Sequence, residues 1–410
     1  MNRLTTIINA EASALNRRAV LNRVRDSGPV SRLELTSGLP FSATTVKRTV
    51  EELLNAGVLR EVSAVKQHNR PGRRSSLLAV APDYAESIGF VITPEKLEMV
   101  AVDLSGGLLA RISFPDQAMT PPKIARKIGT EVAAWKNRRS ASQSPRLLGI
   151  GIGVAGLVDA SKGFVHFCPN LRGWESVEFG RMVRAETGPD VLVDDEVRCM
   201  ALGETRHGRS RGEQTSLFVY VGRGVGAGII IDGRLYRGRH GIAGEFGHIT
   251  VKSEGPLCNC GNRGCLEAVA SVDGIISATN ELIAAHVFTT LGSGKDSRGP
   301  VTLEQLTAAV SAGDKVAIMV ADDTGDQLGT GLADLINIFD PGLVVLGGEV
   351  VDAFGDFLID RIAQTVRLRG IPAITGKTRI VRSQLEGAAA IGAATLPVER
   401  FFETDILNFF

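Results

Sequence analysis

GIAGEFGHITVKSEGPLCNCGNRGCLE, residues 241–267, carries the densest set of chemically informative side chains in the chain. It places His248 ten residues before the first cysteine of a Cys-x-Cys-x4-Cys group, Cys258, Cys260 and Cys265. One imidazole and three thiolates form a closed tetrahedral ligand set of the kind that structural zinc prefers. A disulfide among incidental cysteines is the alternative, but Cys258 and Cys260 are too close for an easy bridge. The segment therefore predicts a structural Zn2+ site held by these four residues.

Two carboxylates accompany the predicted metal loop. Glu245 lies three residues before His248, and Glu267 lies two residues after Cys265. A metal bound to one ring nitrogen of His248 leaves the other nitrogen free to orient a carboxylate or a ligand hydroxyl. Carboxylates beside a neutral imidazole suit a polyhydroxylated, uncharged ligand. The same segment therefore predicts a ligand site next to the metal.

The pattern G-x-x-G-E-x-G-H, followed by C-x-C-G-x-x-G-C-x-E, resembles the ROK family of repressors, open reading frames and sugar kinases. The resemblance implies that His248 both binds zinc and touches a sugar, and that Glu245 and Glu267 contact sugar hydroxyls. It also implies an α/β body made of two lobes of the actin-like, ribonuclease-H-like fold, with the sugar in a cleft. A further match, Pro169-Asn170-Leu171-x-x-Trp174, implies that Asn170 lines the sugar site.

Length and composition indicate a soluble globular protein of two or three domains. The chain has 410 residues, 44% hydrophobic and 22% charged, with a net charge of +1. Residues 1–80 hold 13 Lys+Arg against 6 Asp+Glu, so a basic amino-terminal part precedes an acidic remainder. No apolar run approaches about 18 residues and no signal-peptide core is present at the start, so a cytoplasmic protein without membrane contact is expected. Cys168 and Cys199 are expected to be buried thiols.

The basic part, residues 15–80, predicts three short helices and a hairpin. The first helix ends at Gly28-Pro29, and a capping box begun by Ser31 starts the second. Ser42 is the expected cap of the third helix, which Gly57 closes. This order of elements is typical of a winged helix-turn-helix domain.

The third helix and the loop of the hairpin carry the side chains expected to bind DNA. The two strands are predicted at about 58–65 and 77–80, with a basic loop between them. Short polar and basic side chains on the helix suit a major groove, and arginines on the loop suit phosphates or a minor groove. A winged helix used for protein contacts is the alternative. The predicted DNA-binding residues are Ser42, Thr44, Thr45, Lys47, Arg48, Arg70, Arg73 and Arg74.

Three successive patterns between Asn16 and Val46, N-x-x-x-V-L-x-x-x-R, G-P-x-S-R-x-E-L and G-L-x-x-x-T-V, resemble the DNA-binding head of ROK repressors. After this head the chain alternates strands and helices, which is the pattern of an α/β protein. A last helix, at about 385–396, is expected to return to the first lobe. We expect a head at 1–82, a first lobe at 83–194 and 381–410, and a second lobe with the zinc site at 195–380.

Asp194 and Asp195 end a predicted strand, at a position where α/β sheets present ligand groups. Two adjacent carboxylates repel each other, so one of them is expected to have a raised pKa unless donors separate them. The resemblance implies that Asp195 stands at the position of the general base in the kinases of the family. It also implies that Asp194 replaces a common asparagine. A strand end without a ligand is the alternative.

The loops that hold ATP phosphates in a ROK kinase depart here from the family pattern. The kinases open the first lobe with D-x-G-G-T, and residues 91–95 of this chain read VITPE. Proline removes a backbone donor, and glutamate repels phosphate. A second loop, 221–226, keeps its glycines but has Arg223 where threonine is usual, and VVLGGE at 344–349 resembles the turn on the adenosine side. We therefore expect ATP binding to be lost or crippled, and no catalytic residue to act.

The favoured hypothesis is a sugar-responsive transcriptional regulator, a repressor of carbohydrate uptake or catabolism genes. It would bind operator DNA as a homodimer or homotetramer, and a sugar would shift the balance between lobe arrangements. The alternative is a sugar kinase with an added DNA-binding head, which Asp195 keeps open. In a third hypothesis the body answers to a regulatory protein partner. The apolar tail, Phe401-Phe402 and 406–410, suits such a contact, an oligomer interface or core packing.

Overall fold

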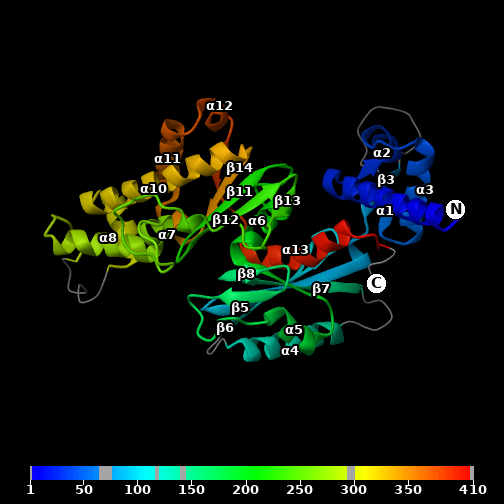
Figure 1. Cartoon of the computed structure of the whole chain (residues 1–410), viewed down its shortest axis with the longest axis horizontal. Helices are drawn as coiled ribbons and strands as arrows, with labels where there is room; N and C mark the ends of the chain where they lie inside the picture. The colour runs from blue at the N-terminus through cyan, green and yellow to red at the C-terminus, as the bar shows by residue number, and fades with distance from the viewer. Residues whose placement is uncertain (1, 64–75, 116–119, 139–144, 293–300, 407–410) are drawn as a thin grey trace. The chain divides into compact units, whose positions relative to one another are not determined.

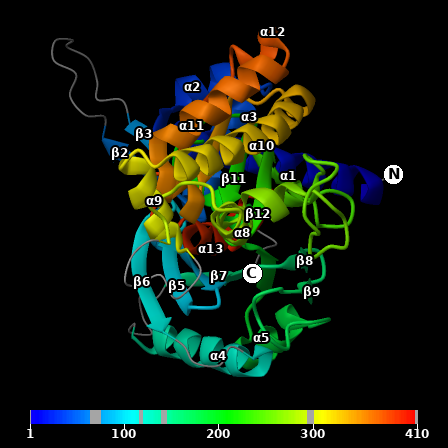
Figure 2. The same ribbon diagram turned by 90° about the vertical axis from the view of Figure 1, so that its left-hand side faces the viewer.

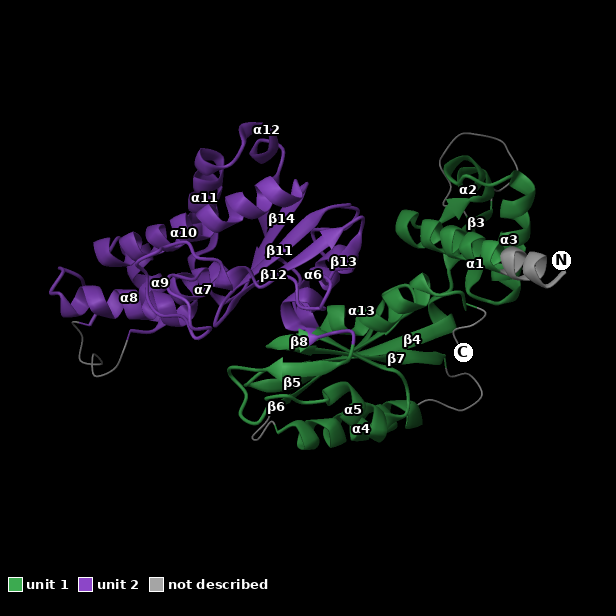
Figure 3. Ribbon diagram, in the orientation of Figure 1, with its two compact units in different colours: residues 1–158, 162–194, 390–410 green, residues 159–161, 195–389 purple. Residues whose placement is uncertain are grey.

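The computed structural model describes residues 2–63, 76–115, 120–138, 145–292 and 301–406. The chain separates into two compact units, which Figure 3 draws in different colours. The predicted boundaries of a head and two lobes stay a prediction. Unit 1 consists of residues 1–158, 162–194 and 390–410, and unit 2 of residues 159–161 and 195–389.

Unit 1 begins with the winged helix-turn-helix fold. Its elements are α1 (Asn2–Ser27), β1 (Val30–Ser31), α2 (Arg32–Gly38), α3 (Ala43–Asn55), β2 (Leu59–Ser63) and β3 (Ser76–Val80). The expected capping box is present, because the Ser31 hydroxyl accepts from the backbone of Glu34 and the Glu34 carboxylate accepts from the backbone of Ser31 at 2.7 Å. Ser42 caps α3 by accepting from the backbone of Thr45. Local signals in the sequence therefore set the starts of α2 and α3.

The head differs from the sequence-based expectation in two places. α1 spans 26 residues instead of a short helix, because no glycine or proline interrupts the chain between residues 2 and 27. The short strand β1 was not expected, and it pairs with β3, which pairs with β2. The predicted DNA-binding residues of the wing, Arg70, Arg73 and Arg74, lie outside the described residues.

The rest of unit 1 is built on one five-stranded sheet. Its elements are η1 (Pro82–Tyr84), β4 (Ala85–Ile92), β5 (Lys96–Asp103), β6 (Leu108–Pro115), α4 (Pro121–Asn137), β7 (Arg146–Val154), β8 (Leu157–Asp159), β9 (Phe164–Phe167), α5 (Phe179–Thr187), β10 (Val191–Asp195) and α13 (Ala388–Glu403). The strand order is β10-β7-β4-β5-β6. β5 is antiparallel to both β4 and β6, and β4 is parallel to β7. Helices α4 and α5 cover one face of the sheet (Figures 1 and 2), over a core that includes Phe90, Trp174 and Phe179.

Unit 2 repeats this sheet topology. Its elements are α6 (Glu196–His207), β11 (Ser216–Val221), β12 (Val225–Ile231), β13 (Arg234–Tyr236), η2 (Phe246–His248), α7 (Leu266–Ala270), α8 (Val272–Ala284), α9 (Leu303–Ser311), α10 (Lys315–Phe339), β14 (Leu343–Gly347), α11 (Glu349–Arg369), α12 (Pro372–Thr375) and β15 (Arg379–Arg382). The order β13-β12-β11-β14-β15 again joins antiparallel strands to parallel ones. This duplicated sheet is the two-lobed, ribonuclease-H-like architecture expected for the body.

Helix α13 packs on the face of the unit 1 sheet opposite α4 and α5. Its expected range was about 385–396, and the helix continues through Pro397 to Glu403. Pro397 has no N–H to donate to the carbonyl of Ala393, and that carbonyl lies against the bare backbone of Gly151, where a side chain would clash with it. Phe401 and Phe402 are buried. This part of the apolar tail therefore packs into the core, and residues 407–410 lie outside the described residues.

Among the described residues, no helix combines the length and the apolar character needed to cross a bilayer.

Candidate metal and ligand site

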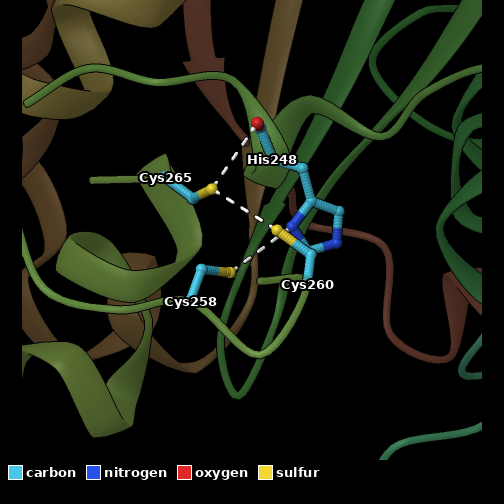
Figure 4. A group of neighbouring side chains, drawn as sticks. All are labelled: His248, Cys258, Cys260 and Cys265. Atoms are coloured by element: carbon cyan, nitrogen blue, oxygen red, sulfur yellow. Dashed lines mark hydrogen bonds between the residues drawn. The ribbon is translucent and has the colours of Figure 1, made fainter. Parts of the chain in front are cut away.

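The four predicted metal ligands lie together in unit 2, as Figure 4 shows. His248 is the last residue of η2, Cys258 and Cys260 lie on the following loop, and Cys265 immediately precedes α7. The backbone of Leu266 donates to the carbonyl of Ile249 at 2.9 Å. Both ends of the metal loop are therefore fixed to regular structure.

The loop folds back on itself because glycine stands where its two arms touch. Gly264 has φ +65°, and a side chain there would clash with the carbonyl of Lys252. The Gly264 carbonyl accepts from the backbone N–H groups of Val251 at 2.9 Å and Lys252 at 3.2 Å. These contacts bring Cys265 beside the two cysteines of the loop.

The spacing of the ligand atoms fits a single tetrahedral ion. Cys258 Sγ lies 3.7 Å from His248 Nδ1, and Cys260 Sγ lies 3.6 Å from Cys265 Sγ. All four ligand atoms lie within 4.8 Å of one another. Ligands at about 2.0–2.3 Å around one tetrahedral ion are separated by roughly 3.5–3.8 Å. The group is therefore arranged to hold one metal ion.

The thiols of this group need a cation to ionise together. Burial, followed by contact with Cys260 and Cys258, raises the pKa of Cys265 to about 12. Burial also raises the pKa of Cys258, whereas a hydrogen bond from the backbone of Asn262 lowers the pKa of Cys260. A metal ion would compensate the crowded charge and hold all three sulfurs as thiolates.

The two predicted ligand carboxylates of unit 2 lie next to this group. His248 Nδ1 faces the sulfurs, while its Nε2 lies 3.8 Å from Glu245 Oε2. Glu245 is open to solvent on one side, but the protein packed around its carboxyl group raises its pKa, against the opposing charges of His248 and Arg198. Glu267 Oε2 accepts from the backbone of Val225 at 3.0 Å. The imidazole thus lies between the metal group and a carboxylate, and its contact with a sugar stays a prediction.

Asp195 and a residue that the sequence did not indicate, Arg198, belong to the same part of unit 2. Asp195 is the N-cap of α6, and its Oδ1 accepts from the backbones of Val197 at 2.9 Å and Arg198 at 3.1 Å. The Arg198 side chain is almost fully buried and donates to the carbonyl of Ala243 at 3.2 Å, on the segment that leads to Glu245. In the sequence, Arg198 stands out only as a single arginine within the largely apolar run that follows Asp195.

Asn170 and Asp194 belong to unit 1. Asn170 is exposed on the turn after β9, and Asp194 is buried near the end of β10. Asn170 follows the end of β9, and Asp194 is the penultimate residue of β10. Their role as ligand residues stays a prediction. The two cysteines outside the metal group, Cys168 and Cys199, are buried free thiols as expected.

The exposed side of α3 carries the described part of the predicted DNA interface. Thr44, Lys47 and Arg48 are exposed. Lys47 and Arg48 lie 4.0 Å and 3.7 Å from glutamates one turn further along the helix. Thr45 is half-buried and its hydroxyl lies 2.9 Å from that of Ser42, so these two residues also serve the helix cap.

A winged head followed by two sheets of one topology and a loop with three cysteines and a histidine defines a two-lobed protein of the actin-like class. The model of the ROK family matches residues 88–400, and the chain belongs to this family. The range matched by the family model covers the body and excludes the head.

The relatives fall into two groups that differ in how much of the chain they cover. The DNA-binding transcriptional dual regulator NagC of Escherichia coli is 30% identical over 387 residues, which are 93% of this chain and 92% of NagC. A crystal structure of a ROK family transcriptional regulator, a homologue of the E. coli MLC protein, matches with a TM-score of 0.81 and 26% identity, over 97% of this chain and 99% of that one. A glucokinase of Thermotoga maritima is 34% identical over 315 residues, which are 74% of this chain and 98% of the kinase.

Proposed function

We propose that this protein is a sugar-responsive, DNA-binding transcriptional regulator, and that it represses genes of carbohydrate uptake or catabolism. The observation that carries the proposal is the extent of its similarities. The match to NagC spans 93% of the chain and so extends into the head, whereas the match to the glucokinase spans 74%. A kinase body alone leaves the winged head without a role.

The head supports binding to double-stranded operator DNA. Its third helix presents Thr44, Lys47 and Arg48 to solvent, and these side chains suit base edges and phosphates in a major groove. A pair of heads, in a homodimer or homotetramer, would read two half-sites.

The group in unit 2 supports a sugar or sugar derivative as the effector. Carboxylates at Glu245 and Glu267, with the Nε2 atom of His248 beside the first, offer acceptors for several hydroxyls. We assign the metal as structural zinc, because three thiolates and one imidazole fill its four positions and leave none for a catalytic water. When bound, the ion would fix the ring of His248 against Glu245.

The turn between β4 and β5 argues against phosphoryl transfer. The backbone N–H of Thr93 donates to the carbonyl of Lys96 at 3.1 Å, and the N–H of Lys96 donates to the Thr93 hydroxyl at 3.3 Å. Pro94 has no N–H. The turn is closed on itself and offers no row of donors to the phosphates of ATP.

The second candidate phosphate loop, residues 221–226, is also bonded internally and has a carboxylate against its backbone. The N–H of Gly222 donates to the carbonyl of Gly224 at 2.9 Å, and the Glu349 carboxylate, which accepts from the Tyr220 hydroxyl at 2.7 Å, lies directly against Gly222. A carboxylate at this point repels a phosphate. The relation to glucokinases makes sugar phosphorylation the second candidate function, and a regulatory protein partner remains the third.

Replacing Arg48 with alanine is expected to weaken DNA binding without changing the response to sugar. The variant removes an exposed cation from α3, and loss of one such contact should raise the Kd roughly tenfold and reduce the salt dependence by about one counterion. The measurement is fluorescence anisotropy with a duplex that the wild-type protein has selected from a random-sequence pool. Lys127→Ala, which removes an exposed cation from α4, is the matched control. Loss of sugar-induced thermal stabilisation in Arg48→Ala would mean that the functions of head and body are wrongly assigned.

A further inference from the structure

The first helix of the chain is joined to the last one. Within unit 1, the Asn22 side chain donates to the carbonyl of Phe402 at 2.9 Å, and Arg18 donates to the carbonyl of Glu403 at 2.8 Å. The Arg25 guanidinium lies 4.4 Å from the centre of the Phe402 ring. α1 of the head therefore packs against the carboxyl-terminal end of α13.

One arginine extends this contact to the recognition helix. Arg17 Nε and NH2 donate to the two carboxylate oxygens of Asp405 at 2.8 and 2.7 Å, and its NH1 donates to Glu52 on α3 at 3.1 Å. The other oxygen of Glu52 lies 3.7 Å from Arg48 Nε. The side chains of Arg17 and Asp405 are only 9% and 12% exposed. A continuous row of alternating charges thus runs from Asp405 to the DNA-facing surface of α3.

The bidentate geometry makes this contact directional. A guanidinium that meets a carboxylate through two parallel bonds fixes the angle between the two segments as well as their distance. Arg25 provides a contrast, because its ion pairs among the described residues are with Glu399 of α13 at 3.2 Å and with Asp26 of α1 at 3.0 Å, and not with α3. Arg25 ties α1 to α13, whereas Arg17 ties α1 to the segment directly after α13 and also holds the recognition helix.

α13 is itself held along its length. Gly89 and Gly151 of the sheet lie so close to its backbone that a side chain at either would clash. Ala388, the first residue of the helix, belongs to unit 2, where its carbonyl lies against Gly203 of α6. α6 is the helix that Asp195 caps. The helix that meets the head therefore begins in the unit that carries the candidate effector site.

We propose that Arg17 is a positioning residue for DNA binding, which through Asp405 fixes the recognition helix to the segment that directly follows α13. The head then keeps one orientation on α13, and a shift of this helix would be passed to α3. This inference rests on the proposed function, because it concerns how the head is held for DNA. It assigns roles to residues that do not themselves face the groove.

Asp405→Asn is the sharpest test, because charge alone predicts the opposite result. Removing a negative charge near a basic head should leave affinity for DNA unchanged or improve it. If Asp405 positions α3, the Kd for the selected duplex should rise about tenfold, since Arg17 loses its bidentate partner. Arg17→Gln should show a similar loss, and Asp405→Glu, which keeps the charge, should stay within about threefold of wild type.

Arg25→Gln is the matched control, because, like Arg17→Gln, it removes one positive charge from α1. It should change the Kd less than about threefold. Hydrogen exchange provides a readout that needs no DNA: the amides of α3 should exchange faster in Asp405→Asn than in Arg25→Gln, at a temperature where both variants are folded. Affinity in Asp405→Asn that equals or exceeds that of wild type, or an equal loss in Arg25→Gln, would overturn the inference. If the wild-type protein selects no duplex, the proposed function fails instead. The exchange rates then still test whether the contact between Arg17 and Asp405 holds α3.

Discussion

Replacement of Cys265 with serine is expected to abolish stoichiometric metal binding and to lower the midpoint of thermal unfolding by roughly 10 °C. Cys265 is fully buried and its sulfur lies 3.6 Å from that of Cys260. A hydroxyl is a poor substitute for a thiolate, and the free energy of binding structural zinc, about 10–16 kcal/mol in small domains, is also free energy of folding. Losing several kcal/mol of it shifts the midpoint by about 2–4 °C for each kcal/mol in a unit of this size.

Metal content and calorimetry on the same samples test this expectation. Cys199→Ala changes another buried cysteine of unit 2 and should keep one metal ion per chain. Cys260→Ser should resemble Cys265→Ser in metal content, although Cys260 is exposed. Full metal content in Cys265→Ser would exclude the proposed ligand set. Loss of metal with no change in the unfolding midpoint would exclude its structural role.

Replacement of Gly151 with alanine is expected to destabilise the protein by at least about 3 kcal/mol, at the upper end of overpacking effects. A methyl group at this position would overlap the carbonyl oxygen of Ala393. Because of this overlap, α13 would have to move away from the sheet. The same carbonyl already lacks its helical partner, since Pro397 has no N–H. Urea unfolding, with the slope checked against wild type, measures the effect.

Gly173→Ala is the contrasting variant for this prediction. Gly173 has φ +80° and no other atom near the position of an added side chain. Its replacement costs only backbone strain, about 1 kcal/mol. Equal effects of the two substitutions would mean that close packing of α13 on the sheet is not what Gly151 provides.

The parts of the fold that were predictable from the sequence are those determined locally. The capping box at Ser31 and the cap at Ser42 each act within three residues, and the structure contains both. The ligands of the metal group lie in one short segment with glycines at its turns, so their spacing alone predicted that they meet. The α/β pattern of the body likewise follows from short apolar strands separated by turn residues.

The parts that were not predicted depend on distant partners. Arg17 and Asp405 are 388 residues apart, and nothing in either segment marks them as a pair. α10 contains Gly325 and Gly329, which lower helix propensity, but a side chain at either would crowd α11 at Arg361 or Thr365. The last helix was expected to end at about residue 396, and it continues through Pro397 to Glu403. In these two helices tertiary contacts outweigh the low helix propensity of glycine and proline.

The most direct test of the central claim is the release of DNA by sugar in the absence of ATP. Wild-type protein, loaded with zinc, is titrated into the selected duplex, and the Kd is measured by anisotropy with a panel of sugars and sugar phosphates, each with and without Mg-ATP. We predict that one of them raises the Kd by about 5- to 150-fold, that Mg-ATP changes nothing, and that the sugar is recovered unmodified. A response that requires Mg-ATP and converts the sugar to its phosphate would contradict the account and identify the protein as a kinase.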